Sequence, residues 1–271
     1  MRSSIENLLY FYGKLGRPLT FIQIAEVLGV REAEESIEAG EESGEIVQWN
    51  GFYTLKEFSP TFQKIYKEQS LLDKKWKKLL GLGRFFSYVP FIDFVLVGGS
   101  MALGNVSEKS DFDVLVGVRK GSIFTARYLA LLIFSLLGAR RLDDSEYSSP
   151  DKFCFNHFVT EETYSKPPYN YYRRELFRNS IPIYGDAGKI EKFLKENGVG
   201  IAGLKILDHR YLGSNKNLFA VILEKLFSGK LGDFVEEKIA SPIAQKRLTK
   251  YLKSKKNNGR FRYYYLRFLL E

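Results

Sequence analysis

The sequence predicts a mixed α/β protein of the α+β type, in which a small sheet is flanked by helices. Three observations support this class. Short apolar runs with many β-forming residues recur at Val95–Val97, Val114–Val116 and Lys152–Val159. Glycine or polar residues bound these runs, which is typical of buried strands. Helical patterns of apolar residues precede the runs in residues 3–43 and follow them in residues 165–271.

Residues 1–57 are predicted to form a domain of three helices and a β-hairpin. Thr20 is a suitable N-cap for the second helix, which Gly29 ends. Asn50-Gly51 separates two β-rich runs and is a strong signal for a two-residue hairpin. Three helices followed by a hairpin resemble a winged-helix domain.

The third predicted helix of this domain, from about Arg31 to Ser43, is acidic. Winged-helix domains often bind DNA through this helix. Phosphate neutralisation supplies most of the affinity for a duplex, so an acidic helix repels it. The sequence therefore argues against duplex DNA as a partner and leaves open a solvated face or a contact with protein. The acidic residues are Glu32, Glu34, Glu35, Glu38, Glu41 and Glu42.

The rest of the chain divides into three segments. Residues 58–89 are predicted to form a basic linker helix, residues 90–164 an α/β core and residues 165–271 a helical region. Pro167-Pro168 lies at the start of the last segment and interrupts regular structure there.

The α/β core contains two carboxylates on which the functional hypothesis depends. Asp111 and Asp113 open the second apolar run. Side chains alternate along a strand, so the two carboxylates face the same side, with Cα atoms about 6.6 Å apart. Carboxylates placed in this way can hold one Mg²⁺ or a pair of ions. The alternative is a solvated strand end, which the apolar neighbours of both acids disfavour because a buried acid needs compensation.

A glycine turn precedes the acid pair. Gly98-Gly99-Ser100 ends the first apolar run, and a ten-residue spacer separates it from Asp111. The two glycines let the backbone turn sharply and approach a phosphate closely. Ser100 is placed to cap a short helix over Met101–Gly104, whose exposed N–H groups attract phosphate.

The strand, the turn and the acid pair together resemble the DNA polymerase β-like nucleotidyltransferase superfamily. The likeness runs from about Phe85 to Thr160 and is specific for the superfamily rather than for an acceptor. It implies a nucleotidyltransferase-type mixed sheet, in which Gly99 and Ser100 contact a nucleoside triphosphate. It also implies that Asp111 and Asp113 bind Mg²⁺, as one or two ions. The implied reaction transfers a nucleoside monophosphate from the triphosphate to an unidentified acceptor hydroxyl.

The third run, Lys152–Val159, lacks the carboxylate that active members of the superfamily carry on a later strand. Asn156 has the nearest shape and is the candidate for completing the catalytic site through its carbonyl oxygen. His157 is the candidate for a base or metal ligand if the strand register differs. Either residue can equally be an ordinary half-buried edge residue. Cys154 is expected to be a buried thiol. The missing acid leaves an alternative function open, a catalytically inactive module of this fold that binds nucleotide or RNA.

Two basic residues near the motif are candidate phosphate ligands. Lys109 precedes the acid pair, and Arg127 lies in the helix expected after the second strand. Arginine forms bidentate contacts with phosphate. The alternatives, a solvated lysine and an exposed arginine, stay open for both residues.

The composition of the 271-residue chain indicates its partners and location. The net charge is +9, and the segment from Lys246 to Arg267 has nine basic residues, no acidic ones and Tyr263–Tyr265. Such a segment suits RNA or another polyanion, although a packed tyrosine face with a basic rim is equally open. A single cysteine fits a reducing cytosol, so we expect a cytoplasmic protein. No signal peptide is evident, and the longest apolar stretch, Tyr128–Ala139, is too short to span a bilayer, so we expect no membrane partner.

Overall fold

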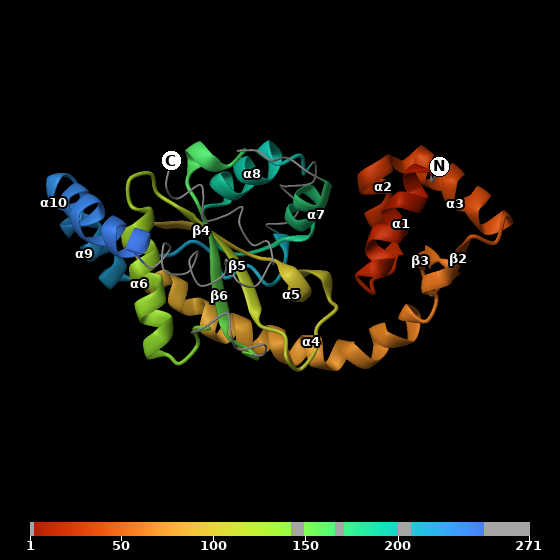
Figure 1. Cartoon of the computed structure of the whole chain (residues 1–271), viewed down its shortest axis with the longest axis horizontal. Helices are drawn as coiled ribbons and strands as arrows, with labels where there is room; N and C mark the ends of the chain where they lie inside the picture. The colour runs from red at the N-terminus through yellow and green to blue at the C-terminus, as the bar shows by residue number, and fades with distance from the viewer. Residues whose placement is uncertain (1–2, 142–148, 166–170, 200–206, 247–271) are drawn as a thin grey trace. The chain divides into compact units, whose positions relative to one another are not determined.

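The computed structural model describes residues 3–141, 149–165, 171–199 and 207–246 (Figure 1). The chain divides into two compact units. One comprises residues 1–77 and 103–110, and the other comprises residues 78–102 and 111–271. The long helix α4 (Thr61–Gly83) contains the first point of division, after Lys77.

The N-terminal unit contains the three helices and the hairpin that the sequence predicts. Its strands form an antiparallel sheet in the order β1-β3-β2. Asn50 and Gly51 have positive φ angles of 50° and 82°, as a two-residue hairpin requires, so the predicted hairpin is confirmed. The elements are α1 (Ser4–Lys14), β1 (Leu19–Thr20), α2 (Phe21–Leu28), α3 (Val30–Glu42), β2 (Ile46–Trp49) and β3 (Phe52–Leu55).

Capping and apolar spacing explain these helices. The Thr20 hydroxyl accepts the backbone N–H of Gln23, and the Gln23 side chain accepts the backbone N–H of Thr20, which forms a capping box at the start of α2. In α3, Ala33 and Ile37 are buried four residues apart, on one helical face. All six glutamates of α3 are exposed, which places the predicted acidic face in solvent.

Residues 103–110 also belong to the N-terminal unit. The Asn105 side chain donates to the carbonyl oxygen of Leu15 at 2.7 Å. Lys75 is only 3% exposed, and its ammonium group donates to the carbonyl oxygens of Glu108 and Ser110 at 3.2 and 2.9 Å. These hydrogen bonds compensate a buried charge and hold the segment in place.

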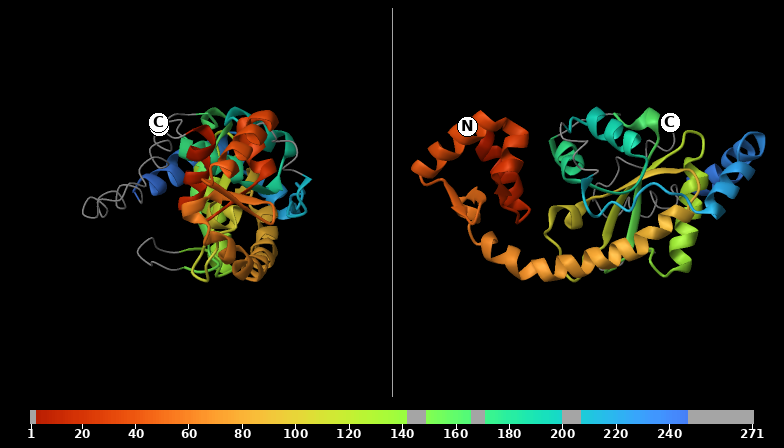
Figure 2. Two further views of the ribbon diagram at one scale, coloured as in Figure 1. Left: turned by 90° about the vertical axis from the view of Figure 1, so that its right-hand side faces the viewer. Right: turned by 180° about the vertical axis from the view of Figure 1, so that it is seen from behind.

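The second unit is built on a four-stranded mixed sheet in the order β6-β5-β4-β7 (Figures 1 and 2). β4 is antiparallel to both of its neighbours, and β5 and β6 are parallel. The predicted α+β class is therefore confirmed. The elements are η2 (Arg84–Tyr88), β4 (Ile92–Val97), α5 (Gly99–Leu103), β5 (Phe112–Val118), α6 (Ile123–Leu136), β6 (Phe153–Val159), η3 (Glu161–Thr163), α7 (Tyr171–Asn179), β7 (Ile181–Gly185) and α8 (Ala187–Glu196).

The two faces of this sheet have different apolar cores. On one face, Phe112 and Phe153 contact each other, and Phe153 also contacts Phe134 of α6. On the other face, Leu115 belongs to a cluster that includes Phe193 of α8. Because side chains alternate along β5, Asp113 shares the face of Leu115, next to the layer of α7 and α8.

β7 is a strand within residues 165–271, which the sequence analysis expected to form a helical region. Ile181–Gly185 pairs with β4, and Ile183 and Tyr184 are buried. Proline is tolerated at the edge of a sheet because no neighbour needs its missing N–H, which explains Pro182 in this strand.

Two glutamates attach the helices that follow to the rest of the unit: the buried Glu236 bonds to α6, and the half-buried Glu224 bonds to Phe91 just before β4. Glu236 accepts the backbone N–H groups of Phe124 and Thr125 and the Thr125 hydroxyl, at 2.6 to 2.8 Å. Glu224 accepts the N–H of Phe91 at 2.7 Å and pairs with Lys216. Burial raises the pKa of Glu224, but these hydrogen bonds outweigh burial, and its pKa is lowered overall. The elements are α9 (Leu218–Leu226), α10 (Lys230–Phe234) and η5 (Val235–Ala240).

None of the helices within the described ranges combines the length and apolar character needed to cross a membrane. The predicted basic, tyrosine-rich tail after Lys246 lies outside the described residues.

Candidate metal site

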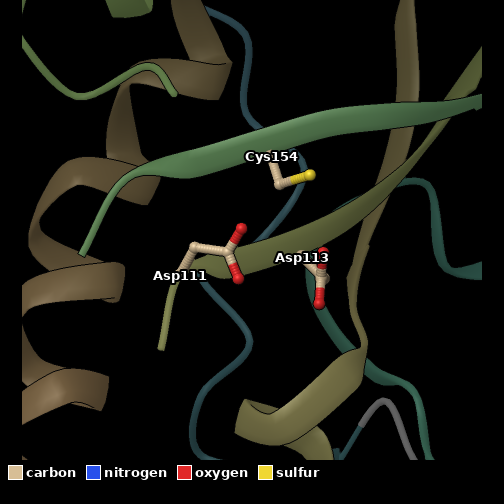
Figure 3. Close-up of side chains that lie close together, drawn as sticks. All are labelled: Asp111, Asp113 and Cys154. Atoms are coloured by element: carbon tan, nitrogen blue, oxygen red, sulfur yellow. The ribbon is translucent and has the colours of Figure 1, made fainter. Parts of the chain in front are cut away.

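Two parallel strands bring three metal-ligating side chains together. Asp111 directly precedes β5, Asp113 is its second residue, and Cys154 is the second residue of β6. The strand register pairs Asp113 with Cys154. A carboxylate oxygen from each aspartate and the cysteine Sγ lie within 4.8 Å of one another (Figure 3). The prediction that the two carboxylates lie close together is confirmed.

Cys154 is the member of this group that the sequence analysis did not assign to the site. Its side chain is buried, whereas both aspartates are half-buried. Burial, together with the charges of Asp113 and Asp111 and a hydrogen bond to Asp113, raises the pKa of the Cys154 thiol far above its usual value. Without a metal, the thiol therefore stays protonated at neutral pH.

Arg141 adds a positive charge to the site. Its guanidinium Nη1 lies 2.5 Å from Oδ2 of Asp111, and both side chains are mostly buried, with exposures of 15% and 20%. The Arg141 N–H donates to the carbonyl oxygen of Phe153, and the Phe153 N–H donates to Ala139, so backbone pairing holds Arg141 beside β6. Two aspartates and one arginine have a net charge of about −1.

The glycine turn packs directly against Asp113. Gly99 has a φ of +58°, and a Cβ added to it meets Oδ2 of Asp113 at 2.2 Å and Cγ at 3.1 Å. The Gly98 N–H donates to the carbonyl oxygen of Asp113 at 2.9 Å. The glycine turn and the acid pair, which are separated in the sequence, are therefore in direct contact in the structure.

The short helix after the turn begins earlier than predicted. α5 starts at Gly99, and the Gly98 carbonyl accepts the N–H of Ala102 at 3.3 Å. The expectation that Ser100 caps a helix over Met101–Gly104 is therefore wrong. Ser100 lies within the first helical turn because Gly98 already makes the first helical hydrogen bond.

The other predicted ligands are not members of the group formed by Asp111, Asp113 and Cys154. Asn156 lies in β6, and its side chain is outside what the structure describes. His157 is half-buried and pairs with Leu115. Lys109 is exposed in the turn before Asp111. The roles proposed for Asn156 and Lys109 stay predictions.

Arg127 lies in the first turns of α6, where its guanidinium carbon is 5.6 Å from the centre of the Phe158 ring. Cation–π attraction contributes to this placement. At the start of the same helix, Glu236 already accepts the N–H groups of Phe124 and Thr125. An intramolecular carboxylate therefore occupies the helix start beside Arg127.

The donor set fits a divalent cation. Asp111 and Asp113 offer the oxygen atoms that Mg²⁺ prefers, and one or two carboxylates are its usual protein ligands. Comparison with protein-family models, with curated proteins and with solved structures finds no match to this chain. The functional argument therefore depends on the geometry of the site.

Proposed function

We propose that the chain is a metal-dependent nucleotidyltransferase that transfers a nucleoside monophosphate from a nucleoside triphosphate to an acceptor hydroxyl. The observation that supports this most is the contact between Gly99 and the Asp113 carboxylate, with Asp111 beside it. The Gly98-Gly99 turn, which has no side chains, thus borders a pair of carboxylates at the start of β5, an interior strand of the sheet. This arrangement suits a phosphate group that reaches a metal ion.

Asp111 and Asp113 would hold Mg²⁺, which when bound neutralises charge that develops on the phosphates. Gly98 and Gly99 let the phosphates approach the backbone, and Ser100 and Lys109 are the proposed further phosphate ligands. Arg127 is left out of this proposal, because it lies beside Phe158, which pairs with Val116 on the opposite face of β5 from Asp113. Arg141 adds a guanidinium within reach of the acid pair. Catalysis would come mainly from positioning and charge neutralisation, as in phosphoryl transfer generally.

A second candidate function is a catalytically inactive module of the same fold that binds nucleotide or RNA. One observation favours it: the β6 residue in register with Asp113 is Cys154, and β6 contains no carboxylate. A protonated thiol is a weak hydrogen-bond donor and a poor base. In this alternative the basic C-terminal region would contact RNA.

Calorimetric titration with each nucleoside triphosphate and Mg²⁺ tests binding, and pyrophosphate release with candidate acceptors tests turnover. Asp111→Asn and Asp113→Asn should abolish metal-dependent nucleotide binding, because each removes a charged ligand at nearly constant size. Glu161→Gln, which changes an exposed carboxylate paired with Lys192, is the matched control and should bind as the unmodified chain does.

The two functions predict different results. Nucleotide binding with pyrophosphate release supports the transferase, and nucleotide binding without release supports the inactive module. Unchanged metal-dependent binding in both aspartate variants contradicts both functions.

A further inference from the structure

We propose that Asp111, Asp113 and Cys154 form a three-ligand site for a thiophilic divalent cation of the Zn²⁺ class. This inference rests on the metal-binding part of the proposed function and is independent of nucleotidyl transfer. It assigns a ligand role to Cys154, and it distinguishes the cations that use the thiol from Mg²⁺, which takes oxygen ligands.

The geometry already approaches that of a metal site. A tetrahedral Zn²⁺ with oxygen ligands near 2.0 Å and sulfur near 2.3 Å separates its ligand atoms by about 3.5 Å. The three ligand atoms of the site lie within 4.8 Å of one another without an ion. The difference of about 1 Å is small enough for rotation of the aspartate side chains to close, since strand pairing already places the backbone of Asp113 beside that of Cys154.

The environment of Cys154 also points to a cation. Its Sγ shares a space with two carboxylates (Figure 3). Its sequence neighbours, Phe153 and Phe155, belong instead to an apolar aromatic cluster. Arg141 pairs with Asp111, so the two aspartates and the arginine together have a net charge of about −1 in a half-buried place. Such a negative charge favours the binding of a cation.

A divalent cation neutralises the net charge of the three ligands and Arg141. When the ion binds, the S–H bond of Cys154 breaks, the proton passes to solvent, and the thiolate forms a bond to the metal. Two carboxylates, one thiolate, Arg141 and the divalent cation then have a net charge of zero. Mg²⁺ leaves the thiol protonated and uses only the two carboxylates.

Cd²⁺ titration of the full-length chain gives a direct test, because Cys154 is the only cysteine. A near-ultraviolet thiolate-to-cadmium charge-transfer band must therefore come from this residue. We expect the band to saturate at one equivalent of Cd²⁺ and to be removed by excess Zn²⁺. Cys154→Ser should abolish the band and weaken Cd²⁺ binding at least about tenfold, because an alcohol is a poor ligand for a soft cation.

Two controls test whether the thiol and the carboxylates bind the same ion, and a third checks folding. Calorimetric Mg²⁺ binding should change by less than about twofold in Cys154→Ser, because Mg²⁺ does not use sulfur. Asp113→Asn should weaken Cd²⁺ binding although it leaves the thiol in place. Circular dichroism shows whether each variant folds, and Cys154→Ala replaces Cys154→Ser if the serine variant does not.

Absence of the charge-transfer band in the unmodified chain overturns the three-ligand site, even if Mg²⁺ binds and the proposed function survives. A band with unchanged Cd²⁺ affinity in Asp113→Asn also overturns it, because the thiol then binds the metal without the carboxylates. Conversely, a saturating band in a chain that does not bind Mg²⁺ supports the inference and contradicts the role of Mg²⁺ in the proposed function.

Discussion

Gly99 meets two constraints at once, and no other residue type satisfies both. Its φ of +58° lies in the left-handed region, which disfavours side chains. The space that a Cβ needs is filled by the carboxylate of Asp113, with Oδ2 at 2.2 Å. The glycine therefore lets the Asp113 carboxylate occupy this space and lets the chain turn.

Gly99→Ala should weaken binding of Mg²⁺ and Cd²⁺, because the methyl group displaces Asp113, and should lower the free energy of unfolding by about 1–2 kcal/mol. Metal titration and urea denaturation measure the two effects. Gly121→Ala is the matched control, since Gly121 has a φ of +74° and nothing within 4 Å of an added Cβ. Gly121→Ala should lower the free energy of unfolding by a similar amount and leave the metal affinity unchanged. Unchanged metal binding in Gly99→Ala would contradict the positioning role.

Arg141 is an internal counter-ion of Asp111, and a metal ion that binds Asp111 either displaces the guanidinium or binds close to its positive charge. Its guanidinium lies 2.5 Å from Asp111 in a mostly buried place, where ionic hydrogen bonds are strong. Repulsion between the guanidinium and an incoming cation raises the free energy of the metal-bound state.

Arg141→Gln should therefore increase the affinity for Mg²⁺ alone by about tenfold, which corresponds to about 1.4 kcal/mol. Calorimetry in the absence of nucleotide measures this change. Lys192→Gln, at an exposed pair with Glu161, is the control and should leave Mg²⁺ affinity as it is. A fall in metal affinity in Arg141→Gln would mean that Arg141 orients Asp111 for the metal instead of competing with it.

The sequence predicts part of this site for a clear physical reason. Residue alternation along one strand places Asp111 and Asp113 on the same face, and the glycine turn is visible as a pattern. Cys154 and Arg141 join them through pairing between distant segments, and the register of that pairing decides which β6 residue lies beside Asp113. The expected strand is present, but its register is not predictable from the pattern. Asn156 is the candidate by its shape and His157 by another register, and the pattern gives no reason to consider Cys154 as a ligand.

At the scale of elements, Glu236 links η5 to the first turn of α6. Its carboxylate accepts three hydrogen bonds from Phe124 and Thr125 and is buried. A helix start leaves its first N–H groups without helical partners, and here a distant side chain satisfies two of them.

Glu236→Ala should lower the free energy of unfolding by about 2 kcal/mol, because it leaves buried donors without an acceptor. Urea denaturation followed by circular dichroism measures the loss. The neighbouring Glu237 is exposed, so Glu237→Ala is the matched control and should change stability by less than about 0.5 kcal/mol. Equal stability of the two variants would contradict the anchoring role of Glu236.

Elements with strong local signals were predicted well, and those that depend on tertiary contacts were not. The helices of the N-terminal unit follow from caps and apolar spacing, and the hairpin follows from Asn50-Gly51. β7 has only five residues and contains Pro182, which disfavours a strand in general. It becomes a strand because β4 offers a free edge with buried Phe94 and Leu96 to pair with.

At the scale of the whole molecule, positive charge is concentrated at the C-terminal end. Eight basic residues and one acidic residue follow Lys246. Removal of this segment therefore lowers the net charge from +9 to +2, so most of the excess charge that favours a polyanion belongs to it.

A chain that ends at Lys246 should consequently bind single-stranded RNA more weakly than the full chain. Each phosphate contact that is lost should reduce the slope of log affinity against log salt concentration by about 0.7, because fewer counterions are released. Fluorescence anisotropy at several salt concentrations measures both quantities.

The combined substitutions Tyr263→Leu, Tyr264→Leu and Tyr265→Leu separate base stacking from charge, since they should lower the affinity for RNA and leave the salt slope unchanged. Equal affinity and equal slope for the full and shortened chains would contradict an RNA contact through this segment, and the acid pair would then be the remaining candidate for polyanion binding, through a metal ion.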